Sequence, residues 1–281
     1  MRCVIDDDLT EYADRVTPWL LRDPVANNVA YTLIEQRLSG AVPTEPDALW
    51  IRVLSERDEV VGVALRTPPF GLLLTRVPDE AVDLLIAEIQ RLGIGLPSVN
   101  GPSEVASAFA ARYAPLIGAD REPQYSRLYR LDRVDPPQGV PGNIRAATEA
   151  DRDVLVAWTD EFFAEADPHA PRQAAVQQID ARLGKPDLLW LWEDGGAPVS
   201  MAWLGVPAAG VVRVSGVYTP PDLRGRGYAS ACVAAVSQGA LDRGAVACML
   251  YTDLANPTSN SIYQKLGYHP VTDADTWRFV S

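Results

Sequence analysis

The sequence predicts a mixed α/β protein built from two halves of similar size. β-rich runs alternate with helical segments along nearly the whole chain, which is typical of α/β architectures. A segment rich in proline and glycine, residues 135–142, interrupts this order once near the middle. The length of 281 residues, with 47% hydrophobic and 22% charged residues, suits two ordinary domains with apolar cores. We therefore expect one domain over residues 1–135 and a second over residues 143–281.

In the first half, helices are expected where apolar residues recur every three or four positions, and strands where β-formers cluster. The expected helices are residues 9–21, 25–38, 79–92 and 103–117. The expected strands are residues 49–55, 59–67, 70–76, 97–100 and 125–132.

The second half follows a similar order, so the halves are expected to be divergent copies of one fold. Thr148 is placed to cap a helix that runs through Trp158. Asp194-Gly195-Gly196 is a strong hairpin signal between two β-rich runs. The expected strands are residues 143–147, 188–193, 198–204, 211–218 and 245–251, the expected later helices are residues 228–241 and 258–266, and one or two edge strands are expected in residues 268–280.

Charge and residue usage exclude several classes of function. The net charge is −12 and both halves are acidic, so no nucleic-acid partner is expected. Three widely spaced cysteines and two histidines predict neither a disulfide framework nor a metal site, and His169 is expected to lie in a loop. No apolar run could cross a bilayer, and the acidic start lacks the basic region of a signal peptide, so we expect a cytoplasmic protein with no membrane partner.

The segment that follows residues 211–218 carries the clearest chemistry. An Arg/Gly loop joins this β-rich run directly to a helix, whose first N–H groups lack internal partners and carry partial positive charge. Gly225 and Gly227 have no side chain to block an anion and tolerate positive φ, so that N–H groups converge. Arg224 and Arg226 add full charges. The loop is therefore predicted to bind a diphosphate.

Two common nucleotide-binding folds do not fit this loop. A dinucleotide-binding fold requires GxGxxG, and Ser230 stands where the third glycine would be. A P-loop requires a GxxxxGK[ST] lysine, which is absent here. Taken alone, the loop could also be an ordinary turn between a strand and a helix.

A second pattern lies downstream, in residues 256–268 with the sequence NPTSNSIYQKLGY. Asn256 suits a helix N-cap, Asn260 and Tyr263 share a helix face, and Gly267 suits a C-cap. The loop sequence RGRGYA fits (Q/R)xxGx(G/A), and the two patterns together resemble the pyrophosphate loop and the last helix of the GNAT superfamily of N-acetyltransferases. The resemblance covers roughly residues 143–281.

This resemblance implies a fold and a reaction. The fold would be two GNAT-like domains, each a mixed, mostly antiparallel twisted sheet flanked by helices. The enzyme would be an acyltransferase that moves an acetyl group from acetyl-CoA to a primary amine, on a small molecule or a protein lysine, by direct attack in a ternary complex without a metal. Acetyl-CoA would lie in a V-shaped split between strands 211–218 and 245–251.

The resemblance also implies roles for particular residues. Backbone groups after the split would bind pantetheine, the Val217 N–H would polarise the thioester carbonyl, and the Tyr263 hydroxyl would protonate the leaving thiolate. The acetyl-CoA-binding residues expected in this way are Val217, Tyr218, Thr219, Arg224, Gly225, Arg226, Gly227, Tyr228, Ala229, Ser230, Asn256, Asn260 and Tyr263.

The catalytic base is less directly indicated. Many members of the family have a glutamate on the strand before the loop, where this chain has Arg213 and Ser215. Glu161 and Glu165 are four residues apart on one helical face that would overhang the acceptor pocket, so both are candidate catalytic residues. A solvated acidic face is the structural alternative for this pair, and Asp253 is a further candidate.

The first half lacks the diphosphate loop, because Asp79 and Glu80 stand at its corresponding helix start and would repel anions. It is expected to be a degenerate copy that has lost CoA binding, as in tandem members of this family. The second half is similar to a bacterial group of acetyltransferases with poorly defined acceptors. A non-catalytic acyl-CoA sensor or interaction module is the alternative function. The acidic charge slightly favours a cationic acceptor, and a monomer or homodimer is expected.

Overall fold

The computed structural model describes residues 1–166 and 173–280, which form two compact units. Unit 1 comprises Met1–Leu128, Thr252–Asn256 and Pro270–Ser281, and unit 2 comprises Tyr129–Tyr251 and Pro257–His269. The expected division into a degenerate first half, residues 1–135, and an acetyl-CoA-binding second half, residues 143–281, remains a prediction.

The strands of unit 1 follow the order β1-β2-β3-β4-β5-β12-β6. Neighbouring strands are antiparallel from β1 to β4 and between β5 and β12, whereas β4 and β5 are parallel. The strands are β1 (Arg2–Ile5), β2 (Leu49–Leu54), β3 (Val60–Arg66), β4 (Leu72–Leu74), β5 (Ser98–Pro102), β6 (Asp120–Leu131) and β12 (His269–Val280).

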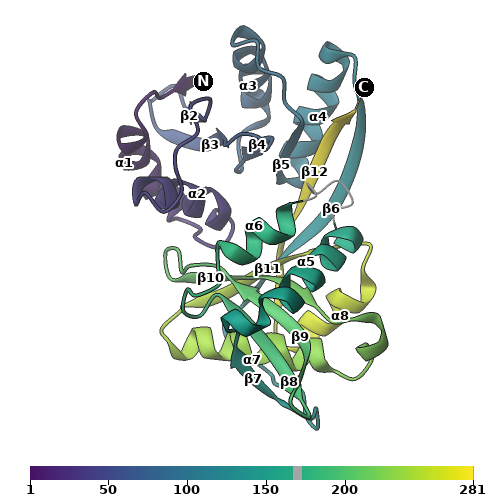
Figure 1. The fold of residues 1–281 in the computed structure, drawn as a ribbon. Helices are drawn as coiled ribbons and strands as arrows, with labels where there is room; N and C mark the ends of the chain where they lie inside the picture. The colour runs from purple at the N-terminus through teal and green to yellow at the C-terminus, as the bar shows by residue number, and fades with distance from the viewer. Residues whose placement is uncertain (167–172, 281) are drawn as a thin grey trace. The chain divides into compact units, whose positions relative to one another are not determined.

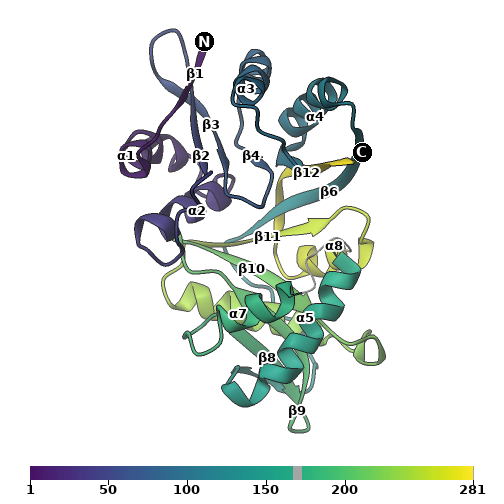
Figure 2. The same ribbon diagram turned by 45° about the horizontal axis from the view of Figure 1, so that its top comes forward.

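Helices cover both faces of the sheet in unit 1. On one face α3 (Asp79–Arg91) and α4 (Ser103–Ile117) lie side by side over an aliphatic core from β2 to β5 (Figures 1 and 2). On the other face α1 (Leu9–Leu20) and α2 (Asn28–Leu38) pack on a second core that includes Trp50. The amphipathic character predicted for these helices explains why each buries a single face.

Unit 2 repeats this plan with strands in the order β7-β8-β9-β10-β11, followed by the last residues of β6. All neighbours from β7 to β10 are antiparallel, and β10 and β11 are parallel. The strands are β7 (Asn143–Ala146), β8 (Leu189–Asp194), β9 (Ala197–Leu204), β10 (Val211–Tyr218) and β11 (Ala247–Asp253). In each unit one parallel pair therefore follows a run of antiparallel strands.

The two faces of the sheet in unit 2 carry different helices (Figure 1). One face packs on α7 (Tyr228–Asp242) and α8 (Pro257–Lys265), in a core that contains Val212 and Val214 of β10. The other face packs on α5 (Arg152–Ala166) and α6 (Ala174–Asp180), in a core that contains Trp203 and Tyr218. Short 3₁₀ turns, Glu149–Asp151 and Pro221–Leu223, precede α5 and follow β10.

The predicted mixed α/β fold with mostly antiparallel sheets is confirmed, one strand was missed and one local expectation is wrong. The N-terminal strand β1 was not expected from the sequence. Residues 269–280 form one strand that pairs with β5 inside the sheet, between β5 and β6, rather than at an edge. Strand neighbours are chosen by contacts far apart in the sequence, so local patterns indicate a strand without indicating its partner.

Candidate active site

Strands β10 and β11 of unit 2 are paired at only one end. Their parallel register runs from Val211 opposite Ala247 to Arg213 opposite Met249, and stops there although β10 continues to Tyr218. The second half of β10 thus presents an edge that β11 does not cover. The resemblance to GNAT enzymes implied a split between these two strands, and the end of the register places its narrow end beside Arg213.

A β-bulge shapes the uncovered part of β10. The register with β9 shifts between Ser215 and Tyr218, and Gly216 has a φ of 54°. A Cβ atom on Gly216 would lie 2.1 Å from the indole ring of Trp203, so only glycine fits here. Bulges re-aim the residues that follow them, and Val217 has no register partner on β9 or on β11.

Two of the three carbonyl groups predicted to bind pantetheine already have partners within unit 2. The Ser200 hydroxyl donates to the Tyr218 carbonyl oxygen at 3.0 Å, and the Arg224 guanidinium donates to that of Thr219 at 2.8 Å. The peptide groups of Val217 are therefore the better candidates for pairing with an amide of the ligand, as in strand addition.

The loop before α7 has the geometry of an anion-binding nest. Gly225 and Gly227 both have positive φ, 79° and 85°, and Gly227 is the N-cap of α7 without any capping side chain. The Ala231 N–H is bonded to the Gly227 carbonyl, so the N–H groups before it lie at the open end of the helix, where partial positive charge accumulates. The first turn of α7 contains no acid. This arrangement fits the diphosphate of a CoA ester.

The two arginines of the loop differ in their surroundings. Arg224 donates to Glu165 at 2.7 Å and lies 5.5 Å from the ring centroid of Tyr218, so its charge braces the loop against β10 and α5. Arg226 is exposed, donates to the Asp222 carbonyl at 3.1 Å and lies beside the Tyr228 hydroxyl, and among the described residues it has no carboxylate partner. Of the two predicted charges beside the nest, that of Arg226 is therefore the more available.

Both candidate bases on α5 reach the end of β10. Glu161 accepts a hydrogen bond from the Tyr218 hydroxyl at 2.7 Å, and Glu165 pairs with Arg224. Burial, with this hydrogen bond as the next cause, raises the pKa of Tyr218 to about 12. The structure thus brings Glu161 and Glu165 to Tyr218 and Arg224, while both carboxylates remain exposed to solvent.

Helix α8 holds the candidate general acid. The Tyr263 side chain is 9% exposed, and burial raises its pKa to about 12. Its ring packs edge-on against Tyr268, at 5.9 Å between centroids. Three residues earlier, Asn260 accepts a hydrogen bond from the Tyr129 hydroxyl at 3.1 Å, which ties α8 to the end of β6 within unit 2.

The remaining predicted residues lie around these elements. The Tyr228 hydroxyl donates to Asp194 at 2.5 Å, which anchors the start of α7, while Ala229 and Ser230 form its first turn. Asn256 directly precedes α8, as expected for a cap, and the Asp253 carboxylate accepts from the Ala255 N–H at 2.7 Å. His169 lies outside the described residues.

Sequence reasoning missed Ser200 and Tyr129. Ser200 is fully buried, and its hydroxyl links the Tyr218 carbonyl to the Thr219 hydroxyl. Tyr129 is likewise buried and bridges Asn260 to Gln264. A serine in the apolar run of β9 was the available signal, whereas nothing local marks Tyr129, whose partners are more than 130 positions away.

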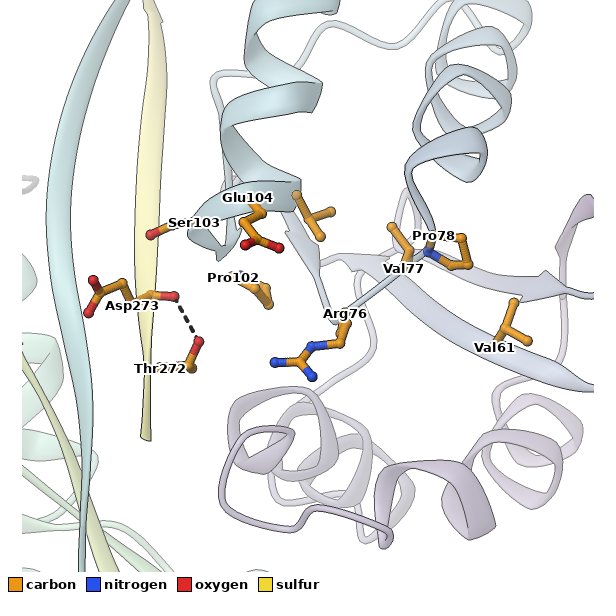
Figure 3. Close-up of a pocket in the computed structure, with 10 residues that line it drawn as sticks. Val61, Arg76, Val77, Pro78, Pro102, Ser103, Glu104, Thr272 and Asp273 are labelled. Carbon is orange, nitrogen blue, oxygen red and sulfur yellow. Dashed lines mark hydrogen bonds between the residues drawn. The ribbon is translucent and has the colours of Figure 1, made fainter. Parts of the chain in front are cut away.

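Unit 1 has a cavity of about 690 Å³ beside its own parallel strand pair (Figure 3). Arg76 and Glu104 project into it, and Pro78, Ser103 and Thr272 contribute to its walls. The neighbouring helix α3 begins with Asp79 and Glu80, as expected, and Asp79 is held by Arg112. The side chains that line the cavity carry both signs of charge, and no glycine is among the described lining residues. The expected loss of CoA binding in the first half remains a prediction.

The described part of the chain contains neither a membrane-spanning helix nor a metal-binding cluster. Within residues 1–166 and 173–280, no helix is both long and apolar enough to span a membrane. The same ranges contain no cluster of three or more acidic, histidine or cysteine side chains arranged to bind a metal ion.

Comparisons with known proteins agree with this geometry. Residues 152–268 match the sequence profile of the Acetyltransferase (GNAT) family. A mycothiol acetyltransferase from Paenarthrobacter aurescens is 28% identical over 184 residues, which span 60% of this chain and 55% of that protein. The chain thus matches about half the length of such curated relatives.

Solved structures resemble the chain over its whole length. A GCN5-related N-acetyltransferase from Sphaerobacter thermophilus has a TM-score of 0.63 at 17% identity, covering 99% of this chain and 96% of that one. A GNAT-family acetyltransferase from Colwellia psychrerythraea has a TM-score of 0.59 at 12% identity, with full coverage of both chains. These similarities show the fold, and they fit two GNAT-like domains. Residues 152–268 thus form a domain of the Acetyltransferase (GNAT) family, and the chain as a whole shares its fold with these solved structures.

Proposed function

We propose that this protein is an N-acetyltransferase that moves an acetyl group from acetyl-CoA to a primary amine in a ternary complex. The observation that supports this most is the combination, in one unit, of the uncovered edge of β10 with the glycine nest that follows it. An extended pantetheine arm needs free strand peptide groups, and a diphosphate needs converging N–H groups. The order of the two along the chain matches the order of these groups in CoA.

The residues of unit 2 would share the work as follows. The nest at residues 225–230 holds the diphosphate, with Arg226 as the available cation. The peptide groups of Val217 pair with the pantetheine arm, and its N–H polarises the thioester carbonyl at the bulge. Holding the amine and the thioester together provides much of the rate.

The proton steps involve α8 and α5. Tyr263 protonates the departing CoA thiolate, and its raised pKa of about 12 keeps the hydroxyl protonated at neutral pH. Of the two acids on α5, Glu161 is the better-placed base, because its partner Tyr218 is neutral at that pH while Glu165 already neutralises Arg224. The acceptor amine must lose a proton to attack, which gives Glu161 its task.

The test is acetyl transfer by the full chain. Acetyl-CoA is supplied either with single primary amines or with lysine peptides. The released CoA thiol and the acetylated product are both measured. The proposal predicts thiol release that depends on an amine and equals the acetylated product. Tight binding of acetyl-CoA without amine-dependent release would contradict it and favour the acyl-CoA sensor.

A further inference from the structure

Two arginines of unit 2 lie on the sheet face that carries α5 and α6. Arg213 occupies the last paired position of β10 before β11 departs. Its neighbours Val212 and Val214 face the core under α7, so Arg213 points to the opposite face. Arg182 follows α6, and its guanidinium lies 5.2 Å from the ring centroid of Trp203, which belongs to that same face.

Neither arginine has an acidic partner among the described residues. Arg182 donates to the carbonyl and side-chain oxygens of Gln178, and Arg213 makes no ion pair or side-chain hydrogen bond in the described part of the chain. The nearby acids Glu161 and Glu165 have other partners, Tyr218 and Arg224.

Other arginines of unit 2 show how unusual this is. Three of them form close ion pairs with carboxylates, at 2.7–2.8 Å: Arg145 with Asp151, Arg152 with Asp180, and Arg224 with Glu165. Burial lowers the pKa of both Arg182 and Arg213, and the charge of Arg213 lowers that of Arg182 further. A partly buried cation without a counter-charge destabilises the folded protein. An anion that binds beside the two arginines would therefore stabilise it.

Arg213 has a glycine as a neighbour outside β10. Gly205 stands beside it across the strand pair, and a Cβ atom there would lie 3.6 Å from the Arg213 Cβ atom. No side chain therefore fills this position, and both arginines are partly exposed. Along β10, Arg213 lies four residues before Val217, beside which the proposed function puts the reacting thioester, and on the side of Val217 away from the glycine nest.

We infer that Arg213 and Arg182 form a subsite for an anionic group, a carboxylate or a phosphate, carried by the acceptor amine. The inference rests on the proposed function and specifies its substrate class: amino acids or phosphorylated amines rather than simple cationic amines. Guanidinium groups bind such planar or multi-oxygen anions through paired hydrogen bonds. It also reverses the slight preference for a cationic acceptor that the net charge of −12 suggested.

The experiment compares matched acceptors that differ in one charge. Glycine, β-alanine and 4-aminobutyrate are each compared with their carboxamides, and phosphoethanolamine with ethanolamine, in kcat/KM for acetyl transfer and in the thermal midpoint of the CoA complex. We expect the anionic member of at least one pair to be preferred by tenfold or more, since a charge-assisted hydrogen bond contributes about that much. The carboxylate and phosphate pairs distinguish the two kinds of anion.

Variants assign the preference to the arginines. Arg213→Met is expected to reduce the preference at least tenfold and to raise the thermal midpoint of the free protein, because it removes an unpaired cation. Gly205→Glu supplies a carboxylate beside Arg213 and is expected to reduce the preference as well, whereas Gly205→Gln is not. Arg243→Met is the matched control, since Arg243 also stacks on a tryptophan, Trp190, but is paired with Asp187.

Two outcomes would overturn the inference. One is that no anionic member exceeds its neutral partner either in turnover or in thermal shift. The other is that Arg213→Met leaves the anionic preference intact. Failure of the proposed function would look different: acetyl-CoA would bind and no amine would be acetylated, while the thermal shift would still report whether anions bind through Arg213.

Discussion

Tyr263 shows how a single side chain is prepared for a proton transfer. Its ring is almost fully buried in the α7–α8 core, and among the described residues no side chain hydrogen-bonds to its hydroxyl. Because burial raises its pKa to about 12, the group stays protonated over the whole physiological range. The hydroxyl is therefore free of a competing side-chain partner among these residues and can donate to a thiolate that forms beside it.

Tyr263→Phe is therefore expected to lower kcat roughly tenfold or more, the usual contribution of a positioned acid. The affinity for acetyl-CoA should change little, because the ring and its packing are kept. Steady-state kinetics at saturating acetyl-CoA, with calorimetric titration of acetyl-CoA, separates the two effects. Tyr268→Phe is the control, since the Tyr268 hydroxyl hydrogen-bonds to Ser237 instead. Unchanged turnover in Tyr263→Phe would remove the acid role.

At this scale the sequence predicted residue types well and partners poorly. It indicated Arg224 as a ligand for the diphosphate, because loop position and charge are local properties. The structure shows that Arg224 pairs with Glu165, 59 positions earlier in the chain. Only the folded sheet brings these two together, so no local pattern could have revealed it.

The start of α5 shows how an element is fixed by one carboxylate. Thr148 and Asp151 form a reciprocal capping box, and Asp151 also accepts two hydrogen bonds from Arg145, at 2.7 and 2.8 Å. The Arg145 guanidinium is the main cause that lowers the pKa of Asp151 to about 2. The helix that carries Glu161 and Glu165 is thereby attached to β7.

Asp151→Asn is expected to reduce the free energy of unfolding of unit 2 by about 2 kcal/mol at pH 7, since one pKa unit corresponds to about 1.4 kcal/mol. The folded-state pKa of Asp151 lies below its ordinary value, so its stabilisation is present above pH 4 and is lost as the pH falls toward 2. Denaturant titrations of wild type and variant between pH 7 and pH 2.5 measure this.

The exposed pair Arg152–Asp180 provides the control for that series. Asp180→Asn should change the unfolding free energy far less, because solvent-exposed ion pairs contribute little. A difference between wild type and Asp151→Asn that stayed constant down to pH 2.5 would contradict the linkage.

Elements with strong local signals were predicted closely. The observed bounds of β10 equal the predicted ones, and α7 differs by one residue at its end. Both are rich in apolar residues, and they are separated by a segment that contains Pro220, Pro221, Gly225 and Gly227. The short helix α6 and strand β1 lack such signals, which is why they were missed.

At the scale of the whole molecule, the last strand of the chain belongs with the first unit. β12 pairs with β5 from Ala274 opposite Pro102 to Arg278 opposite Ser98. Its Trp277 packs against the core of unit 1 and against Tyr125. The proline-rich segment that divides the sequence in two therefore does not divide the strands between the units, and only long-range pairing could show this.

Trp277→Ala is expected to destabilise unit 1 by roughly 3 kcal/mol, the usual cost of removing a large packed side chain. The amides of β5 should then exchange faster in hydrogen–deuterium exchange. Trp19→Ala is the matched control in the same unit, because Trp19 packs in the core under α1 and α2. Undiminished protection of β5 in Trp277→Ala would contradict the assignment of β12.

The glycine nest before α7, as the site that binds acetyl-CoA, is the feature on which the proposed function depends most. Gly225 tests it cleanly, since a Cβ atom there meets no atom within 4 Å and its φ of 79° is one that Asp and Asn both tolerate. Gly225→Asp and Gly225→Asn differ mainly in one negative charge. We predict that isothermal titration of acetyl-CoA shows affinity at least tenfold lower for Gly225→Asp than for Gly225→Asn, because like charges repel at the nest. Equal affinities in the two variants would contradict the assignment of the nest to acetyl-CoA.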